Sequence, residues 1–321
     1  MGGYIFQRII QAVIVVAMVS MLVFTVMHLL PGDPVMVLSG TSIQGLTPEQ
    51  EAKMRHDLWL DRPLYVQYGH WVWNLLHGDW GTSVRNQVPV FRELQTRLPV
   101  TLQLAIYGWL IAIIIGLTAG VISATRSNTK LDTAATLVSM FGIAMPNFWL
   151  GILLIYLFSM VLGWFPTAGF VSFSEAPLRS LHHMILPAFA LGFVESAVIM
   201  RQTRSGILEV LRQDYVRVAR AKGLSERTIT WIHALKNAAL PILTIMGLQL
   251  GRLIGGTVII EAIFGLPGLG SLAVQSIFMR DYLPLQGVVL LVTLGVAVIN
   301  LLTDMVYAYI DPRIRYGKQN Q

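Results

Sequence analysis

The sequence predicts an all-α, polytopic membrane protein with six transmembrane helices, and three observations lead to this fold class. Of the 321 residues, 55% are hydrophobic and only 12% are charged, and the mean hydropathy is +0.63. Six stretches are apolar for long enough to cross a bilayer core about 30 Å thick, which takes about 20 helical residues. So few charges cannot cover the surface of a soluble protein of this length, which excludes a soluble enzyme.

The six apolar stretches cover residues 9–30, 100–124, about 133–164, 181–200, 238–260 and 283–303. The first is longer than the apolar part of a signal peptide, and Pro31-Gly32-Asp33-Pro34 after it is a turn rather than a cleavage site, so we expect it to be retained. Among the acidic and basic residues, the fourth stretch contains only Glu195 and the fifth only Arg252. Pro146 and Pro187 predict kinks in the third and fourth helices.

The positions of the basic residues predict that both termini of this multi-pass inner-membrane protein face the cytoplasm. Eight of the 23 Lys and Arg residues lie between positions 201 and 236. The other basic residues assigned to the inner side are Arg8, Arg126, Lys130, Arg313, Arg315 and Lys318. The outer loops after the third and fifth stretches contain only Arg179 and Arg280.

The chain divides into three parts: residues 1–30 with the first helix, an extracytoplasmic helical cap at 31–98, and a five-helix core at 99–321. In the cap, the run from Thr47 to Gln50 reads Thr-Pro-Glu-Gln, which is typical of a helix start. A second cap helix is predicted from apolar residues at helical spacing, namely Tyr65, Tyr68, Val72 and Leu75.

The core contains a long cytoplasmic segment at 201–236. One apolar helical face is predicted there by Leu208, Leu211, Tyr215 and Val218, and Gly223 is expected to end that amphipathic helix. Its basic residues suit either an acidic protein partner or anionic lipid headgroups.

Ordered motifs along the chain resemble those of ABC importer permeases, specifically the dipeptide and oligopeptide branch. In the cytoplasmic segment, Ala219 and Gly223 match the second alanine and the glycine of the general Glu-Ala-Ala…Gly pattern, whereas Arg217 and Val218 replace its Glu-Ala. The other motifs are Leu30-Pro31-Gly32-Asp33-Pro34, Gly78-Asp79-Trp80-Gly81, Leu162-Gly163-Trp164-Phe165-Pro166, Ile185-Leu186-Pro187, Pro267-Gly268-Leu269-Gly270 and Asp311-Pro312-Arg313-Ile314-Arg315.

This resemblance implies the type I ABC importer fold and a division of labour. The implied partners are a second homologous permease, two cytoplasmic ATPase subunits and an extracytoplasmic peptide-binding protein. The implied mechanism is alternating access, with di- or oligopeptides as cargo and glutathione or nickel chelates as alternatives. By the same resemblance, the ATPase contacts are expected at Asp214, Tyr215, Arg217, Ala219, Arg220, Ala221, Lys222 and Gly223.

The chain lacks the motifs of an enzyme. It contains no GxxxxGK[ST] phosphate loop, no GxSxG and no HExxH, so we expect no cofactor on it, with ATP and Mg²⁺ on the partner ATPases. The absence of cysteine excludes thiolate metal sites, and no nucleic-acid module accompanies the basic residues. A secondary transporter or channel is the alternative class, but internal repeats and several buried titratable residues are not evident.

Four charged residues in or near the spans are candidates for the translocation path. Glu195 and Arg252 lie deepest, where an unpaired charge costs about 3 kcal/mol or more. They either help to accept a zwitterionic peptide, or they bond to each other or to the partner permease. Glu261 and Asp304 lie nearer the span ends, where we expect them to reach water, and are weaker candidates.

Small residues predict close helix packing. Gly247, Gly251 and Gly255 repeat at intervals of four on the fifth stretch, with the second permease as one candidate partner, and Gly116 and Gly120 do so on the second. The Gly- and Pro-rich stretch 265–284 is expected to be an outer loop that dips toward the pore mouth, with gating as a hypothesis.

Overall fold

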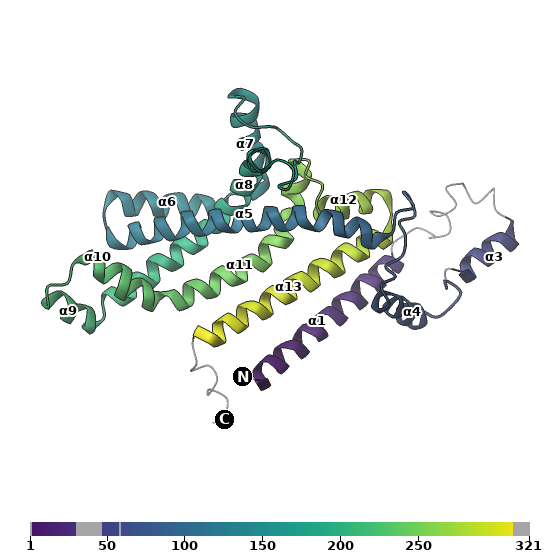
Figure 1. Ribbon diagram of the computed structural model, residues 1–321, viewed down its shortest axis with the longest axis horizontal. Helices are drawn as coiled ribbons and strands as arrows, with labels where there is room; N and C mark the ends of the chain where they lie inside the picture. Colours follow the sequence, from purple (N-terminus) through teal and green to yellow (C-terminus); the bar gives the residue numbers. More distant parts are fainter. Residues whose placement is uncertain (1, 30–46, 58, 311–321) are drawn as a thin grey trace.

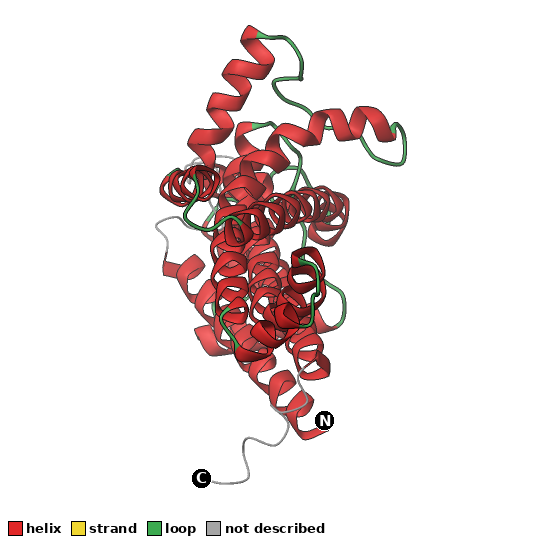
Figure 2. Cartoon of the chain, turned by 90° about the vertical axis from the view of Figure 1, so that its left-hand side faces the viewer, coloured by secondary structure: helices red, strands yellow, loops and turns green. Residues whose placement is uncertain are grey.

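The computed structural model describes residues 2–29, 47–57 and 59–310, and the motifs predicted at 31–34 and 311–315 lie outside these ranges. The described chain is built of helices joined by loops, as Figure 2 shows in red and green. The predicted all-α class is therefore confirmed. The long helices are α1 (Gly2–Leu29), α5 (Val90–Thr125), α8 (Pro177–Leu211), α11 (Leu235–Ile263) and α13 (Tyr282–Ile310).

Each of these five helices contains a segment long and apolar enough to cross a membrane, and a bent pair of helices passes the same test when it is taken as one span. The pair consists of α6 (Lys130–Ala144) and α7 (Asn147–Leu154), which continues as the π-helical turn η2 (Ile155–Val161). The two halves meet at 104°. The change of direction predicted at Pro146 is therefore confirmed, and it is a break in the helix rather than a mild kink, because Met145 before it adopts an extended ψ of 123° that ends α6.

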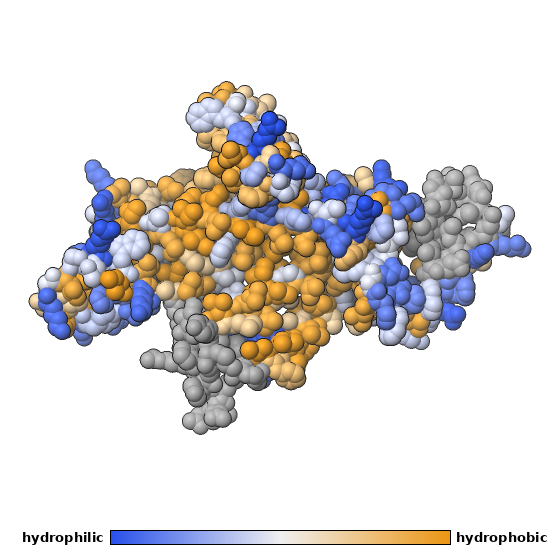
Figure 3. Space-filling model, in the orientation of Figure 1, coloured by the Kyte–Doolittle hydropathy of each residue, from blue (hydrophilic) through white to orange (hydrophobic). Residues whose placement is uncertain are grey.

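The apolar surface forms a continuous band between two polar ends. In Figure 3, hydrophilic residues gather at the end that carries α9 (Asp214–Ala221) and α10 (Glu226–Thr228), and at the opposite end around α3 (Pro48–Asp57) and α4 (Leu64–Leu76). The helices of the band expose large apolar side chains such as Leu22 and Phe141. Such a band suits a lipid surrounding rather than water.

The two predicted cap helices form, and α4 is tied to α1 (Figure 1). Tyr68 Oη lies 2.9 Å from Ser20 Oγ, and Gln67 Oε1 lies 3.1 Å from His28 Nε2. The ring of Phe24 contacts the rings of Tyr68 and Trp71. These contacts hold α4 against the end of the first span.

The core is built on a parallel pair, α5 and α8. A side chain at Gly116 would put its Cβ 2.6 Å from Ile199 Cβ, and one at Gly120 would lie 2.6 Å from Thr203 Cβ. The partner positions rise together along both helices, so the helices run in the same direction. Only glycine permits backbones to approach this closely, which confirms the packing role predicted for this pair.

The glycines of α11 pack within the chain rather than only against a second subunit. A Cβ at Gly247 would lie 2.2 Å from Thr303 Cγ2, and one at Gly251 would lie 3.3 Å from Asn300 Oδ1, both on α13. At Gly255 a Cβ would meet no atom within 4 Å. Of the three, only Gly255 therefore remains open to an outside partner.

The stretch 265–284 is not the loop that its Gly and Pro content suggested. Most of it is helix α12 (Leu269–Met279), whose Leu269 and Leu272 are buried with Val90 and Val288. At the C-terminal end of α12, Ser83 Oγ donates a 2.5 Å hydrogen bond to the buried Asp281. Apolar residues at helical spacing outweigh the flanking Gly and Pro, because they can be buried against α5 and α13.

The contrast between Gly247 and Gly255 predicts opposite responses to the same substitution. Gly247→Ala should lower the free energy of unfolding by about 1 to 3 kcal/mol, because the new methyl group overlaps the β-branched Thr303. Gly255→Ala is the matched control and should leave stability unchanged or raise it by up to about 1 kcal/mol, since alanine favours helix. Thermal unfolding of the detergent-purified protein measures both, and equal midpoints would contradict the assigned α11–α13 contact.

Candidate functional site

The amphipathic helix predicted within residues 201–236 is divided between two helices, α8 and α9. α8 continues to Leu211, residues Arg212 and Gln213 break it, and α9 begins at Asp214. Gln213 has an extended backbone (φ −70°, ψ 148°). Because this residue changes the direction of the chain, the apolar face predicted across Leu208 and Val218 is wrong.

The buried face of α9 consists of Val216 and Ala219, which pack on Ile229 and on the last residues of α8. Tyr215 and Val218, which were predicted to be on the apolar face, are 44% and 54% exposed. Gly223 has φ +79° and follows the helix end, as predicted. α9 is therefore anchored to the end of α8 by a small apolar contact and presents its other faces to solvent.

The residues predicted to contact the ATPase differ in their burial and in their hydrogen bonds within the chain. Ala219 is buried, and the others are exposed. Arg220 forms a two-pronged ion pair with Glu226, with Nε–Oε1 at 2.7 Å and Nη2–Oε2 at 3.2 Å. These bonds hold the pKa of the Glu226 carboxyl below its usual value. Tyr215 Oη accepts a 2.9 Å hydrogen bond from Asn237. The contacts of Arg220 and Tyr215 therefore stabilise the conformation of this segment.

Glu195 and Arg252 do not form an ion pair with each other in the described part of the chain. Gln249 Nε2 donates to the backbone oxygen of Glu195 at 3.0 Å, which brings α8 and α11 together here. Glu195 Oε2 and Gln249 Oε1 are buried without a hydrogen-bond partner among the described residues. The expectation that Glu195 and Arg252 satisfy each other is therefore wrong.

Arg252 lies one helical turn beyond Gln249, on a face of α11 that the rest of the described chain leaves open. Leu248 and Ile259 on the same face are 48% and 51% exposed, and a Cβ at Gly255 would meet no atom within 4 Å. Arg252 is exposed as well. A charge on an apolar, membrane-embedded face requires water or an outside partner.

Glu261 is wholly buried, so the expectation that it reaches water is wrong. Its Oε1 accepts from Thr101 Oγ1 at 2.7 Å and its Oε2 accepts from the backbone N–H of Ser271 at 2.9 Å. Thr101 Oγ1 in turn accepts from the backbone N–H of Leu269 at 2.8 Å. The carboxylate thus holds the N-terminus of α12 to α5 and α11, where a helix N-terminus favours negative charge.

Asp304 is 27% exposed and lies 3.1 Å from Arg8 Nε. This ion pair joins α13 to α1 near the start of the chain. Asp304 therefore has an ion-pair partner within the chain, whereas Glu195 has none among the described residues.

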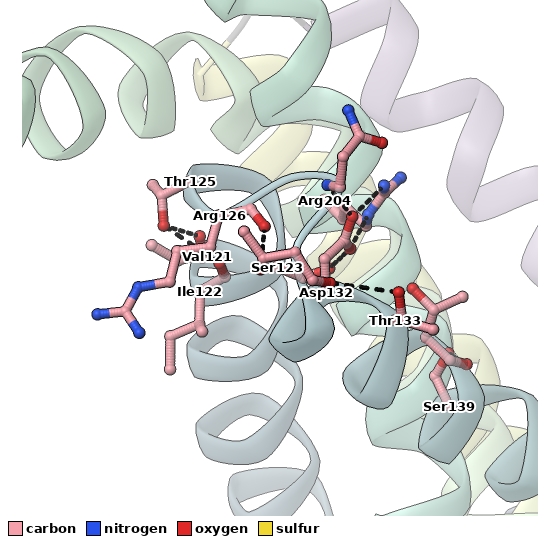
Figure 4. Close-up of polar contacts among 12 residues, drawn as sticks. Val121, Ile122, Ser123, Thr125, Arg126, Asp132, Thr133, Ser139 and Arg204 are labelled. Carbon is pink, nitrogen blue, oxygen red and sulfur yellow. Dashed lines mark hydrogen bonds and ion pairs between the residues drawn. The ribbon is translucent and has the colours of Figure 1, made fainter.

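The structure also reveals an ion pair that the sequence reasoning missed, between the buried Asp132 of α6 and the partly exposed Arg204 of α8. Arg204 Nε and Nη2 lie 2.7 and 2.9 Å from the two carboxylate oxygens. Ser123 also donates to Asp132, which Figure 4 shows between Ser123 and Arg204. Asp132 in the first turn of an apolar helix was the available signal, but Arg204 had been explained by membrane orientation alone.

No group of three or more His, Asp or Glu residues that could hold a metal ion occurs in the described ranges. His182 Nε2 lies 2.8 Å from the carbonyl of Trp164, and His183 Nδ1 lies 3.1 Å from that of Gly169. The two histidines therefore bind the loop before α8 and point to different partners.

The architecture is that of a helical membrane protein with a short, solvent-facing helix, α9, between the long helices α8 and α11. Two family profiles match this chain: the binding-protein-dependent transport system inner membrane component at residues 116–316, and the N-terminal part of such components at residues 1–105. The chain therefore belongs to the family of binding-protein-dependent transport system inner membrane components. It is a multi-pass permease component of the inner membrane.

Similar proteins share nearly the whole length. A putative peptide transport system permease protein of Brucella abortus (strain 2308) is 43% identical over 316 residues, which are 98% of this chain and 100% of that protein. The oligopeptide transport system permease protein AppB of Bacillus subtilis is 41% identical, with 98% and 100% covered. The dipeptide transport system permease protein DppB of Escherichia coli (strain K12) is 39% identical, with 94% and 95% covered.

Solved structures support the fold. The inward-facing MetNI methionine ABC transporter matches with a TM-score of 0.58 and 19% identity, over 70% of this chain and 98% of that chain. An amino acid ABC transporter crystallised with histidines matches with a TM-score of 0.54 and 18% identity, over 68% and 94%. The fold is that of an ABC importer permease.

The burial of Glu261 predicts a large effect on stability. Glu261→Ala should lower the free energy of unfolding by about 3 kcal/mol or more, because it leaves the Thr101 hydroxyl and the Ser271 N–H without their acceptor in an apolar core. Glu175→Ala, at an exposed position, is the control and should change it by less than about 0.5 kcal/mol. Thermal unfolding in detergent measures both, and similar midpoints would show that the buried carboxylate contributes little.

Proposed function

We propose that this chain is one permease subunit of an ATP-driven importer for di- or oligopeptides. The observation that carries the proposal is the identity of 39 to 43% over nearly the whole chain to proteins named as peptide, oligopeptide and dipeptide transport permeases. These relatives favour peptides over nickel chelates or glutathione. Membership of a binding-protein-dependent family argues against a secondary transporter or channel.

The complex that we propose contains a second homologous permease, two cytoplasmic ATPase subunits and an extracytoplasmic peptide-binding protein. ATP and Mg²⁺ bind to the ATPases, and this chain is neither an enzyme nor a cofactor carrier. Residues 1–30 and 99–321 cross the membrane with both termini in the cytoplasm, and residues 31–98 form the outer cap. The grouping of α9 and α10 at one polar end and α3 and α4 at the other supports this arrangement (Figure 1).

In this proposal, segment 201–236 is the coupling segment, and α9 is the contact with the ATPase. Asp214, Arg217 and Lys222 are exposed, with Arg217 Nη1 3.5 Å from Asp214 Oδ1, whereas Tyr215 and Arg220 bond to residues outside α9. ATP-driven closure of the two ATPases moves α9, and the spans alternate between outward and inward openings. The mixed charges on α9 suit a complementary protein surface.

We further propose that Glu195 and Arg252 line the translocation path. They carry opposite charges near one another on α8 and α11 without pairing, and the buried oxygens of Glu195 and Gln249 require a donor. A peptide supplies an ammonium group for Glu195 and a carboxylate for Arg252. The two side chains are therefore complementary to a zwitterion.

The function is tested with the whole complex in proteoliposomes. The purified assembly with loaded binding protein should accumulate peptide only when ATP is supplied to the ATPase side. Peptide uptake by this chain alone, or uptake that needs no ATP, would contradict the proposal.

The coupling role predicts that charge reversal on α9 uncouples the complex. Arg217→Glu with Lys222→Glu should lower ATP-dependent uptake by about tenfold or more while membrane insertion continues, because α9 then repels its partner surface. Arg212→Glu with Arg227→Glu is the control, since it makes the same change in net charge just outside α9. The assignment fails if both double variants transport equally well.

The path role predicts a specific loss at Glu195. Glu195→Gln keeps the size of the side chain but removes the charge that would meet an ammonium group, so uptake at saturating binding protein should fall by about tenfold. ATP hydrolysis should be retained. The exposed Glu209→Gln on the same helix is the control, and wild-type uptake by Glu195→Gln would remove this residue from the path.

A further inference from the structure

The carboxylate of Asp132 is buried at the inner end of the spans and receives four hydrogen-bond donors. Arg204 supplies two of them, at 2.7 and 2.9 Å, and the hydroxyl of Ser123 supplies the third. The backbone N–H of Asn128 is the fourth, at 2.9 Å from Oδ2. Asp132 is 4% exposed and Ser123 is fully buried, so the charge is satisfied entirely within the chain.

Two of these donors belong to the turn that joins α5 to α6. Ser123 lies in the last turn of α5, and Asn128 adopts a left-handed backbone (φ 62°) that asparagine tolerates. This local geometry fixes the hairpin by itself. Arg204, which lies 72 residues along the chain from Asp132, is the donor that ties the hairpin to a distant helix.

Along the chain, Arg204 lies between the apolar span of α8 and α9. Arg204 is seven residues, or about two helical turns, before Leu211, where α8 ends. Leu211 packs with Val216 of α9 and with Ile229. A displacement of α9 therefore reaches the end of α8 first and then Arg204.

Close packing of α8 against α5 beside the ion pair leaves little room for α8 to slide. Gly120 of α5 lies against Thr203, the neighbour of Arg204, so that a Cβ there would be 2.6 Å from Thr203 Cβ. A two-pronged guanidinium–carboxylate pair resists rotation as well as separation. The glycine contact and the ion pair together make α8, the end of α5 and the start of α6 one rigid unit.

We propose that the Asp132–Arg204 ion pair transmits the movement of α9 to the α5–α6 hairpin, so that both residues are positioning residues for transport although neither lies in the coupling helix. This inference rests on the proposed coupling of ATP hydrolysis to transport. Without the pair, α8 moves relative to the hairpin, and ATP is hydrolysed without opening the path. The loss is one of coupling and not of ATPase activity.

The test measures peptide uptake and ATP hydrolysis by the same reconstituted complex. Asp132→Asn removes the charge but keeps the shape of the side chain. Arg204→Lys keeps the charge but cannot form the two-pronged contact of a guanidinium group. Each variant should lower uptake by about tenfold or more while hydrolysis stays within about twofold of the wild type. Arg201→Lys is the matched control, because Arg201 is exposed one turn earlier on α8, and it should transport normally.

A covalent link between positions 132 and 204 tests whether the ion pair acts as a mechanical connection. The chain has no cysteine, so Asp132→Cys with Arg204→Cys introduces two thiols that a short bis-methanethiosulfonate can join in a complex whose other subunits lack accessible cysteines. Cross-linking should restore uptake that the unlinked double variant lacks, because the link replaces the mechanical connection and not the charge.

The inference is overturned if uptake and hydrolysis fall together in the assembled variants, if neither changes, or if the link restores nothing. If the Asp132→Asn variant does not assemble into the complex, the ratio of uptake to ATP hydrolysis in the Arg204→Lys variant decides. If neither assembles, the pair serves stability alone and the inference is likewise overturned. A wild-type complex without ATP-dependent uptake would instead remove the proposed function.

Discussion

The structure depends on one constraint, which is that a charged or polar group inside an apolar slab must find its hydrogen-bond partners within the protein. Two buried carboxylates meet this constraint by joining separate helices. Near one end of the spans, Glu261 accepts hydrogen bonds from Thr101 and from the N-terminus of α12. Near the other end, Asp132 accepts hydrogen bonds from Ser123 and Arg204. The helices between them are packed through glycines, which add close contact but no polar specificity.

The two carboxylates thus join helices near the ends of the spans, whereas some polar groups between them lack hydrogen-bond partners. Glu195 and Gln249 lie between the two carboxylate junctions and retain buried oxygens without partners in the described chain. Nearby Arg252 is exposed on an otherwise apolar face. Thr203 Oγ1, beside Arg204, is a third buried atom without a partner among the described residues, and all three residues lie on α8 and α11.

The coupling segment shows why sequence periodicity was an incomplete guide. Tyr215 and Val218 continue the spacing of Leu208 and Leu211, yet Gln213 turns the chain, so the helix that follows buries Val216 and Ala219 instead. One extended residue is enough to change which side of a helix is buried. In the same way, Met145 before Pro146 converts the predicted kink into a bend of 104°.

The sequence by itself determined the all-α class, the apolar spans, the two cap helices and the resemblance to a transport family, because length, hydrophobicity and turn residues act locally along the chain. Only the tertiary structure decided which charges are paired. Asp132 and Arg204 lie 72 residues apart, and Thr101 and Glu261 lie 160 apart. Their pairing depends on which helices are neighbours and in which register, and a single sequence contains no local signal for that.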